Sequence, residues 1–347
     1  MLLMLALGAF ARDSHDTNDD PSNFPGIDYF LVANKLLNAA EGSRYTISAV
    51  QCRILMAVYL LYGLRTLQAF DTIHLASNTV IALLKLQGRL GADRGFRESC
   101  HRAYWACYII EHELREYISH SAGSLSLARD SVPLPLSDHD EPGIFWLLSE
   151  IALRRIFSDV HDDITQSRHT LYAPIIVEEL STQLTEWYRH LPPGIKFSLT
   201  SDALYDPHQA FLRTQYYSLI CAINWSFVVR LFILDPGDGD DMDRVHKCAK
   251  RSLEYGVLYI DSVQYLLQER DPMLFANLKG TNWISMLLLC TYKAPKLRAI
   301  APPLAASAIQ KGYALLGIWA SNPGIAANLH RLEILMRAAG IPVLEDT

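Results

Sequence analysis

The sequence predicts an all-α protein, organised as a single large helical domain. Apolar residues recur at spacings of three and four along nearly every long segment, whereas the alternating pattern of strands is nearly absent. Half of the 347 residues are hydrophobic and 20% are charged, so the chain can bury a substantial core. We expect about a dozen helices around a central apolar cavity. They would form one domain over residues 1–347, with a soft boundary near residues 131–143.

The periodic segments begin at the N-terminus. We interpret the opening stretch MLLMLALGAFARDS as an amphipathic first helix, although it also resembles a short signal peptide without a basic region. The helical period is clearest in ISAVQCRILMAVYLLYGL, where it falls on Val50, Ile54, Ala57, Val58 and Leu61, and it continues in FDTIHLASNTVIALLKL. Segments rich in Gly, Pro and Asp separate the helices; they lie at residues 91–95, 131–143, 190–194, 235–243 and 300–305.

The composition excludes several classes of protein. A formal net charge of -6 argues against a general nucleic-acid binder, because neutralising phosphates requires clustered Lys and Arg. The six cysteines are scattered without a CxxC pair, which is typical of reduced thiols in an intracellular protein. No uncharged apolar run reaches the length that spans a bilayer, so we predict no transmembrane helix.

Three segments follow a known pattern: AVQCRILMAVYLLYGLRTLQAFDTIHLASNTVIALLKLQ, ESCHRAYWACYIIEHELREYIS and SVPLPLSD. They resemble the middle homology region of fungal zinc-cluster transcription factors. In that family a helix pair leads to a charged residue before a Trp-x-x-Tyr-like helix and then to a Pro-Leu-Pro-type loop. The corresponding residues here are Glu98, Arg102, Trp105, Tyr108 and Pro133 to Pro135, and later Arg230 and Cys248.

The chain also departs from this family. A zinc-cluster factor reads DNA through an N-terminal module whose six cysteines bind two zinc ions, and this sequence starts at Met1 within the helices. The resemblance therefore implies no direct DNA binding by that route. One hypothesis is a nuclear regulator that lacks its DNA-binding domain and acts by sensing a ligand or by pairing with an intact partner. The other is an enzyme that uses the cavity.

Three aspartates lie in the otherwise apolar segment IFSDVHDDITQSR. On a helix, Asp159 and Asp163 lie four residues apart at the edge of an apolar stripe, and Asp162 lies a little further round. Adjacent carboxylates repel each other unless a cation neutralises them, and Mg²⁺ prefers such oxygen ligands. Alternatively, Arg155 forms an ordinary ion pair with Asp159 on a solvated helix face.

The string Asp-x-x-Asp-Asp resembles a permuted form of the Asp-Asp-x-x-Asp motif of class I terpene cyclases, which are also all-helical. This resemblance implies an atypical sesquiterpene cyclase of the humulene-forming type in fungal meroterpenoid biosynthesis. Mg²⁺ on Asp159, Asp162 and Asp163 would activate farnesyl diphosphate, and aromatic side chains would shelter the carbocation. The residues assigned as catalytic are Asp159, Asp163, Trp225 and Trp283. The substrate-binding candidates are Arg155, Tyr217, Asn224, Arg230, Lys250, Arg251 and Lys293.

The two hypotheses remain open at the level of the sequence. The second metal motif of class I cyclases is missing, the basic candidates are commonly solvated helix faces, and tryptophans are commonly core residues. We favour the lyase because a regulator has no evident need of an acidic cluster on a helix. It would be a cytoplasmic protein that binds Mg²⁺ and a prenyl diphosphate, binds no nucleic acid directly and is a possible homodimer; the regulator would be nuclear.

Overall fold

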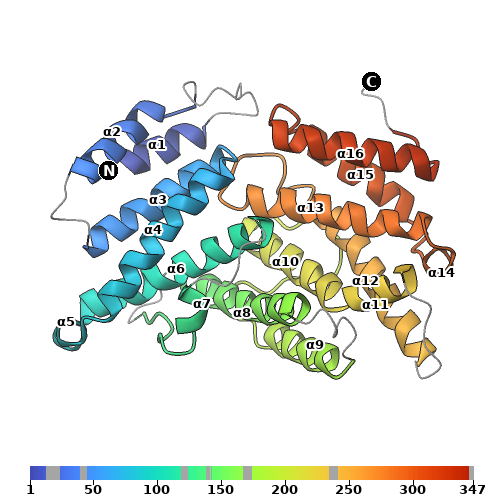
Figure 1. Cartoon of the computed structure of the whole chain (residues 1–347), viewed down its shortest axis with the longest axis horizontal. Helices are drawn as coiled ribbons and strands as arrows, with labels where there is room; N and C mark the ends of the chain where they lie inside the picture. Colours follow the sequence, from blue (N-terminus) through green and yellow to red (C-terminus); the bar gives the residue numbers. More distant parts are fainter. Residues whose placement is uncertain are drawn as a thin grey trace. The chain divides into compact units, whose positions relative to one another are not determined.

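The computed structural model describes residues 1–12, 24–39, 45–118, 124–137, 141, 143–166, 174–233 and 241–343. Every regular element in these ranges is a helix, which confirms the all-α prediction (Figure 1). The elements are α1 (Leu2–Phe10), α2 (Ile27–Ala39), α3 (Ile47–Tyr62), α4 (Thr66–Leu84), α5 (Gln87–Ala92), α6 (Arg94–Ile118), α7 (Ser124–Ala128), α8 (Ile144–Gln166), α9 (Pro174–Arg189), α10 (Pro207–Ile223), α11 (Trp225–Ile233), α12 (Met242–Val263), α13 (Leu274–Leu289), η3 (Cys290–Tyr292), α14 (Pro295–Arg298), α15 (Ala305–Gly317) and α16 (Pro323–Ala339).

The chain divides into two compact units. The first contains Met1–Ile151 together with Glu269–Phe275, and the second contains Ala152–Gln268 and Ala276–Thr347. The division falls inside α8 and on either side of Glu269–Phe275, a short segment that ends within the first turn of α13. The sequence, in contrast, placed its soft boundary near residues 131–143. The single domain and the central apolar cavity stay predictions.

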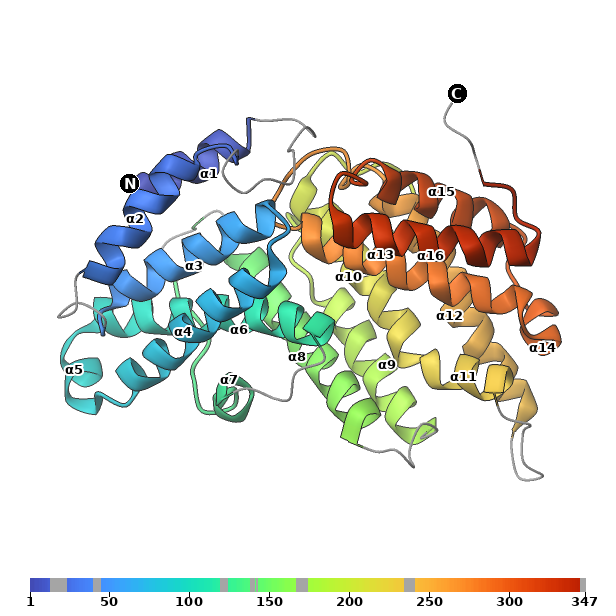
Figure 2. The same cartoon turned by 45° about the horizontal axis from the view of Figure 1, so that its top comes forward.

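The first unit is built on three long helices packed in succession. α3 packs along α4, and α4 packs along α6, while the pair α1 and α2 packs on α3 (Figure 2). The side chain of Thr46 caps α3 by accepting a hydrogen bond from the Ala49 amide. The shared core of α3, α4 and α6 includes Val50, Ile73, Val80, Cys100, Trp105 and Cys107, each of them fully buried. Burial of these apolar faces, rather than intrinsic propensity, stabilises the helices.

The turn between α3 and α4 depends on Gly63. A Cβ atom at this position would lie 2.4 Å from a ring carbon of Phe24, which is closer than real contacts allow. Phe24 is buried and its ring packs edge-on against Phe10, so it has little room to move. The next residue, Leu64, has a φ of 54°, in the left-handed region that costs energy for a residue with a Cβ. This three-residue connection, Gly63 to Arg65, reverses the chain, so that α4 can pack back along α3.

In the second unit, α10 lies at the centre of the packing. It contacts α9, α11 and α12 (Figure 2). Its side chains are buried on nearly all sides. Asp206 caps its first turn by accepting a hydrogen bond from the Gln209 amide, and Pro207 occupies the first helical position. α12 continues the packing to α15, and α15 to α16. Cys221 of α10 and Ser252 of α12 each donate a side-chain hydrogen bond to the other's carbonyl oxygen, which fixes the register of the two helices.

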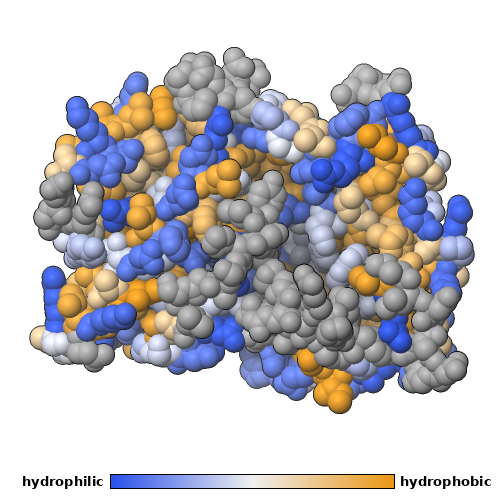
Figure 3. Space-filling model, in the orientation of Figure 1, coloured by the Kyte–Doolittle hydropathy of each residue, from blue (hydrophilic) through white to orange (hydrophobic). Residues whose placement is uncertain are grey.

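Hydrophobic side chains also reach the surface of the first unit. Figure 3 shows hydrophobic atoms where Figure 1 draws α1 and α2. The exposed apolar residues of these helices are Met4, Leu5, Tyr29, Leu31, Val32 and Leu36. Among the helices that the structure describes, none combines the length and the hydropathy required to cross a membrane.

Candidate functional site

The longest helix, α6, carries a polar face opposite its buried face. Asp93 caps the helix by accepting a hydrogen bond of 2.9 Å from the Phe96 amide. Glu98, Arg102 and Trp105 follow at spacings of four and three, so their side chains leave the helix in nearly the same direction. These three residues, which we call the α6 clamp, bind a segment of irregular backbone at residues 133–136.

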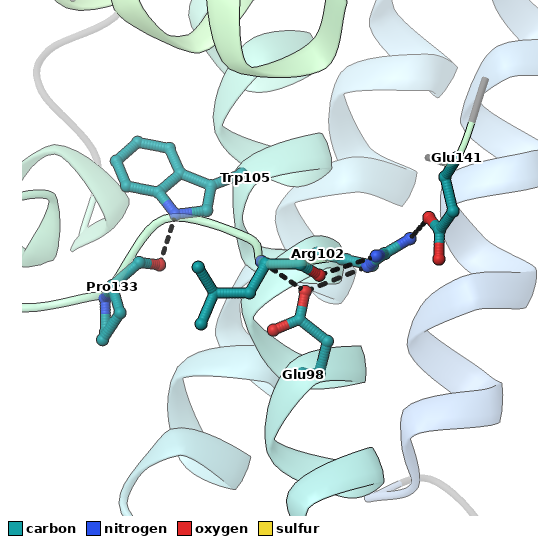
Figure 4. A network of polar contacts seen from close by, with 6 residues as sticks. Glu98, Arg102, Trp105, Pro133 and Glu141 are labelled. Carbon is teal, nitrogen blue, oxygen red and sulfur yellow. Dashed lines mark hydrogen bonds and ion pairs between the residues drawn. The ribbon is translucent and has the colours of Figure 1, made fainter. Parts of the chain in front are cut away.

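The α6 clamp forms hydrogen bonds to three backbone polar groups of this segment (Figure 4). The Leu136 amide donates to Glu98 Oε1 at 2.9 Å, and the Leu136 carbonyl accepts from Arg102 Nη2 at 2.8 Å. The Trp105 indole Nε1 donates to the Pro133 carbonyl at 2.9 Å. Because residues 133–136 belong to no helix, these side chains replace the hydrogen bonds that regular structure would provide.

Arg102 connects the α6 clamp to a further point of the chain. Its Nε donates to Glu98 Oε1 at 3.0 Å, and its Nη1 donates to Glu141 Oε2 at 2.5 Å. The hydrogen bond with Glu141 raises the pKa of the Arg102 guanidinium, against the opposing effect of its partial burial. The side chain of Arg102 is 35% exposed, so the two ion pairs are screened by water. The planar guanidinium contributes mainly geometry, since it reaches a backbone oxygen and two carboxylates at once.

Two more contacts from α6 attach the preceding segment. Tyr104 donates its hydroxyl to the Leu125 carbonyl at 2.7 Å, and Arg115 Nη1 donates to Ser126 Oγ at 2.9 Å. Both acceptors belong to α7, so α6 holds α7 as well as residues 133–136. The ring of Trp105 is fully buried and packs edge-on against Tyr104 and Tyr108. The α6 clamp therefore links a surface segment to the core, and its hydrogen bonds have a structural role.

The structure brings together most residues of the transcription-factor pattern. Glu98, Arg102 and Trp105 all contact the Pro-Leu-Pro loop, and Tyr108 packs against Trp105. The sequence did not indicate that Glu141 would form an ion pair with Arg102, which lies 39 residues before it. Glu141 belongs to residues 131–143, which the sequence marked only as a segment between helices. No local spacing connects these two residues.

The three aspartates lie in α8, as the helical period predicts. The stripe beside them is buried at Leu153, Ile156 and Phe157. The side chains of Asp159, Asp162 and Asp163 lie outside the described residues, so Mg²⁺ binding stays a prediction. Among the side chains that the structure does describe, no group of three or more His, Cys, Asp or Glu could hold a metal ion.

The predicted aromatic and amide residues have structural partners. The rings of Trp225 and Trp283 meet edge-on at 6.3 Å between centroids. Tyr217 is buried, and its hydroxyl donates to the Thr200 carbonyl at 3.0 Å. Asn224 ends α10 and donates its side-chain amide to the Ile220 carbonyl at 2.9 Å. Each of these contacts is sufficient to explain the residue as part of the fold.

The predicted substrate-binding cations are held in several different ways. Lys250 is exposed and forms an ion pair with Glu254 at 3.7 Å, and the Arg251 guanidinium lies over the Tyr255 ring. Lys293 is exposed at the end of η3. Arg155 in α8 and Arg230 in the last turn of α11 are half-buried. Their role in binding a diphosphate stays a prediction.

Comparison with known proteins identifies the family. The fungal specific transcription factor domain matches residues 1–189. ecdB of Aspergillus rugulosus, whose name describes it as a predicted transcription factor, is 27% identical over 291 residues, which are 77% of this chain and 49% of ecdB. An uncharacterised transcriptional regulatory protein of Schizosaccharomyces pombe is 24% identical over 214 residues, which are 56% of this chain and 26% of that protein. The chain thus spans at most about half the length of these relatives, and no solved structure matches it.

These similarities overturn the preference for an enzyme over a regulator, which rested on the acidic cluster of Asp159, Asp162 and Asp163. The description of the chain as a lyase, a humulene-forming terpene cyclase, is wrong, because the matching family and both relatives are transcriptional regulators. The pattern Asp-x-x-Asp-Asp arises easily on the edge of any amphipathic helix, so it carried less information than the longer pattern of α3, α4 and α6. The chain belongs to the family of the fungal specific transcription factor domain.

Proposed function

We propose that this chain is a regulatory module of a fungal transcription regulator, acting in the nucleus. The observation that carries the proposal is the family match over residues 1–189, which includes the whole α6 clamp. In this role the module alters transcription at a promoter and leaves the reading of DNA bases to a different structure. The net charge of -6 supports this division of labour, since an acidic module gains little from contacts with phosphate.

The α6 clamp supplies a physical route from the core to the surface. Trp105 is packed in the core of α3, α4 and α6, and its indole nitrogen holds the exposed residue Pro133. Any shift of α6 in that core would move the hydrogen-bond donors that hold residues 133–136. A partner protein that contacts this segment would therefore respond to the packing state of the unit. Packed cores switch between discrete arrangements, which makes such a link suitable for regulation.

The proposal is tested by tethering the whole chain to a promoter. The chain is fused to an unrelated DNA-binding module in a fungal cell that carries a reporter gene with the matching site. We expect reporter transcription to differ from that with the DNA-binding module alone, and the fluorescently tagged chain to accumulate in the nucleus. Equal reporter output at equal protein level, with the tagged chain excluded from the nucleus, would overturn the proposal.

A further inference from the structure

Among the residues of the second unit that the structure describes, none forms an ion pair with the buried cation Arg213. Arg213 lies in α10 and is 1% exposed, and its Nε and Nη1 atoms are buried without a hydrogen-bond partner. Burying a charge in a protein interior is costly unless hydrogen bonds and an opposite charge compensate it. The other buried arginines that the structure describes all donate hydrogen bonds: Arg115 to Ser126 Oγ at 2.9 Å, Arg154 to Gln215 Oε1 at 3.1 Å and Arg270 to the Tyr62 carbonyl at 2.6 Å.

The neighbours of Arg213 do not neutralise it. Burial lowers the pKa of its guanidinium, and Tyr217 and Asp202 oppose that effect only in part. Asp202 is an exposed residue, and its Oδ2 already accepts a hydrogen bond of 2.8 Å from the Thr200 hydroxyl. Burial also raises the pKa of Tyr217, and it raises the pKa of Tyr216 to about 12. Both phenols therefore stay protonated at neutral pH and provide no negative charge.

Two tyrosines neighbour Arg213 on α10, and they pack in turn against further aromatic rings. Tyr216 and Tyr217 follow Arg213 by three and four residues on α10, and Tyr255 of α12 meets Tyr217 with 5.5 Å between ring centroids. From α9 and the connection after it, Trp187, Tyr188 and Phe197 each have ring centroids within 6.0 Å of Tyr216. A flat apolar group would be favoured among such rings, which prefer stacked and edge-to-face neighbours.

The connection from α9 to α10 is the part of the chain that would have to move to admit a ligand. It is attached to the helices by three side-chain hydrogen bonds to its backbone: Tyr188 to Phe197, Tyr217 to Thr200 and Gln209 to Gly194. Residues 198–200 are exposed and belong to no helix. Breaking a few such bonds costs little compared with unfolding a helix.

We propose that Arg213 and the neighbouring Tyr216 and Tyr217 form a binding site for a small aromatic monocarboxylate. The carboxylate would pair with the guanidinium, and the ring would lie among the aromatic side chains. A single negative charge matches the single positive charge of Arg213, whereas a phosphate dianion would leave excess charge in the interior. Binding is independent of the proposed regulatory function, but the use of the ligand as a regulatory signal rests on that function.

The experiment measures thermal unfolding of the purified chain with benzoate, with the neutral analogue benzamide and with acetate. Benzoate should raise the melting temperature of the wild-type chain in a concentration-dependent way, benzamide should not, and acetate should act far more weakly. Arg213→Met should be at least as stable as the wild type without ligand and should lose the response to benzoate, because it removes an unpaired buried charge. Asp202→Asn, the matched control, should keep the response.

Several results would overturn the proposal. The wild-type chain could show no response to benzoate, or Arg213→Met could respond as strongly as the wild type. A severe loss of stability in Asp202→Asn, with no response to benzoate, would show that Asp202 is the partner of Arg213 in solution. If Arg213→Met does not fold, Arg213→Lys replaces it: it keeps the charge but loses the planar donors, so benzoate should protect it less than the wild type. A benzoate response without any effect of benzoate on the tethered reporter would leave the binding site intact and would overturn only the use of the ligand as a regulatory signal.

Discussion

Replacing Arg102 by Met should release residues 133–136 from α6 while the helix itself stays folded. The substitution keeps the aliphatic part of the side chain and removes donors to the Leu136 carbonyl, to Glu98 and to Glu141. The bond to the backbone carbonyl contributes about 1 kcal/mol, and each half-exposed ion pair contributes about 0.5 kcal/mol. The segment should therefore open more easily by about 2 kcal/mol, which corresponds to about a 30-fold larger open population.

The assay is amide hydrogen exchange at Leu136. This amide lies outside any helix and donates to Glu98 Oε1, so its protection reports the α6 clamp directly. We expect slow exchange in the wild type and about 30-fold faster exchange in Arg102→Met. Arg97→Met is the matched control, since Arg97 lies on the same helix and donates instead to the Leu90 carbonyl at 3.0 Å. Fast exchange of Leu136 in the wild type, or equal exchange in Arg102→Met and the wild type, would refute the reasoning.

Three further predictions follow from buried or half-buried positions of the first unit. Trp105→Phe should lower the free energy of unfolding by about 1–3 kcal/mol, because it removes the hydrogen bond to the Pro133 carbonyl and part of a buried ring. Urea unfolding measures this loss, and an unchanged urea midpoint would contradict the prediction. Gly63→Ala should cost about 1–3 kcal/mol because its Cβ would overlap the ring of Phe24, and Gly63→Ala combined with Phe24→Leu should recover part of that loss in a double-mutant cycle. Burial raises the pKa of Asp271 from 3.8 to about 6, so its contribution favours the folded state below pH 4 and is lost as the pH rises through 6. The free energy of unfolding of Asp271→Asn minus that of the wild type should therefore be larger at pH 7.5 than at pH 4, by up to about 3 kcal/mol. Equal differences at the two pH values would exclude this effect.

The sequence predicted the helices well because their apolar periodicity is a direct consequence of packing. The periodic pattern over residues 47–64 became α3, which ends at Tyr62, and the residues that carried the family resemblance, Glu98, Arg102 and Trp105, all lie on α6. The partners of that face could not be predicted, because Leu136 lies 38 residues after Glu98 and only tertiary structure brings them together.

The proposed anion site was not visible in the sequence either. α10 is buried on nearly all sides, so it has no regular division into a polar and an apolar face. The sequence period therefore could not show that Arg213 is buried. In contrast, the sequence assigned functional meaning to Asn224, whose amide is used in ending α10. Residue type alone does not distinguish a capping amide from a ligand-binding one, because both require the same hydrogen-bonding groups.

Transcription from a promoter to which the whole chain is tethered tests the central claim most directly. The wild-type chain, Arg102→Met and Arg97→Met are compared at equal protein level with the DNA-binding module alone. We predict that the wild type and Arg97→Met change reporter transcription to the same extent, and that Arg102→Met loses most of this effect. If no fusion differs from the DNA-binding module alone, the chain is not a regulatory module; if Arg102→Met equals the wild type although its Leu136 amide exchanges faster, the α6 clamp does not transmit the signal.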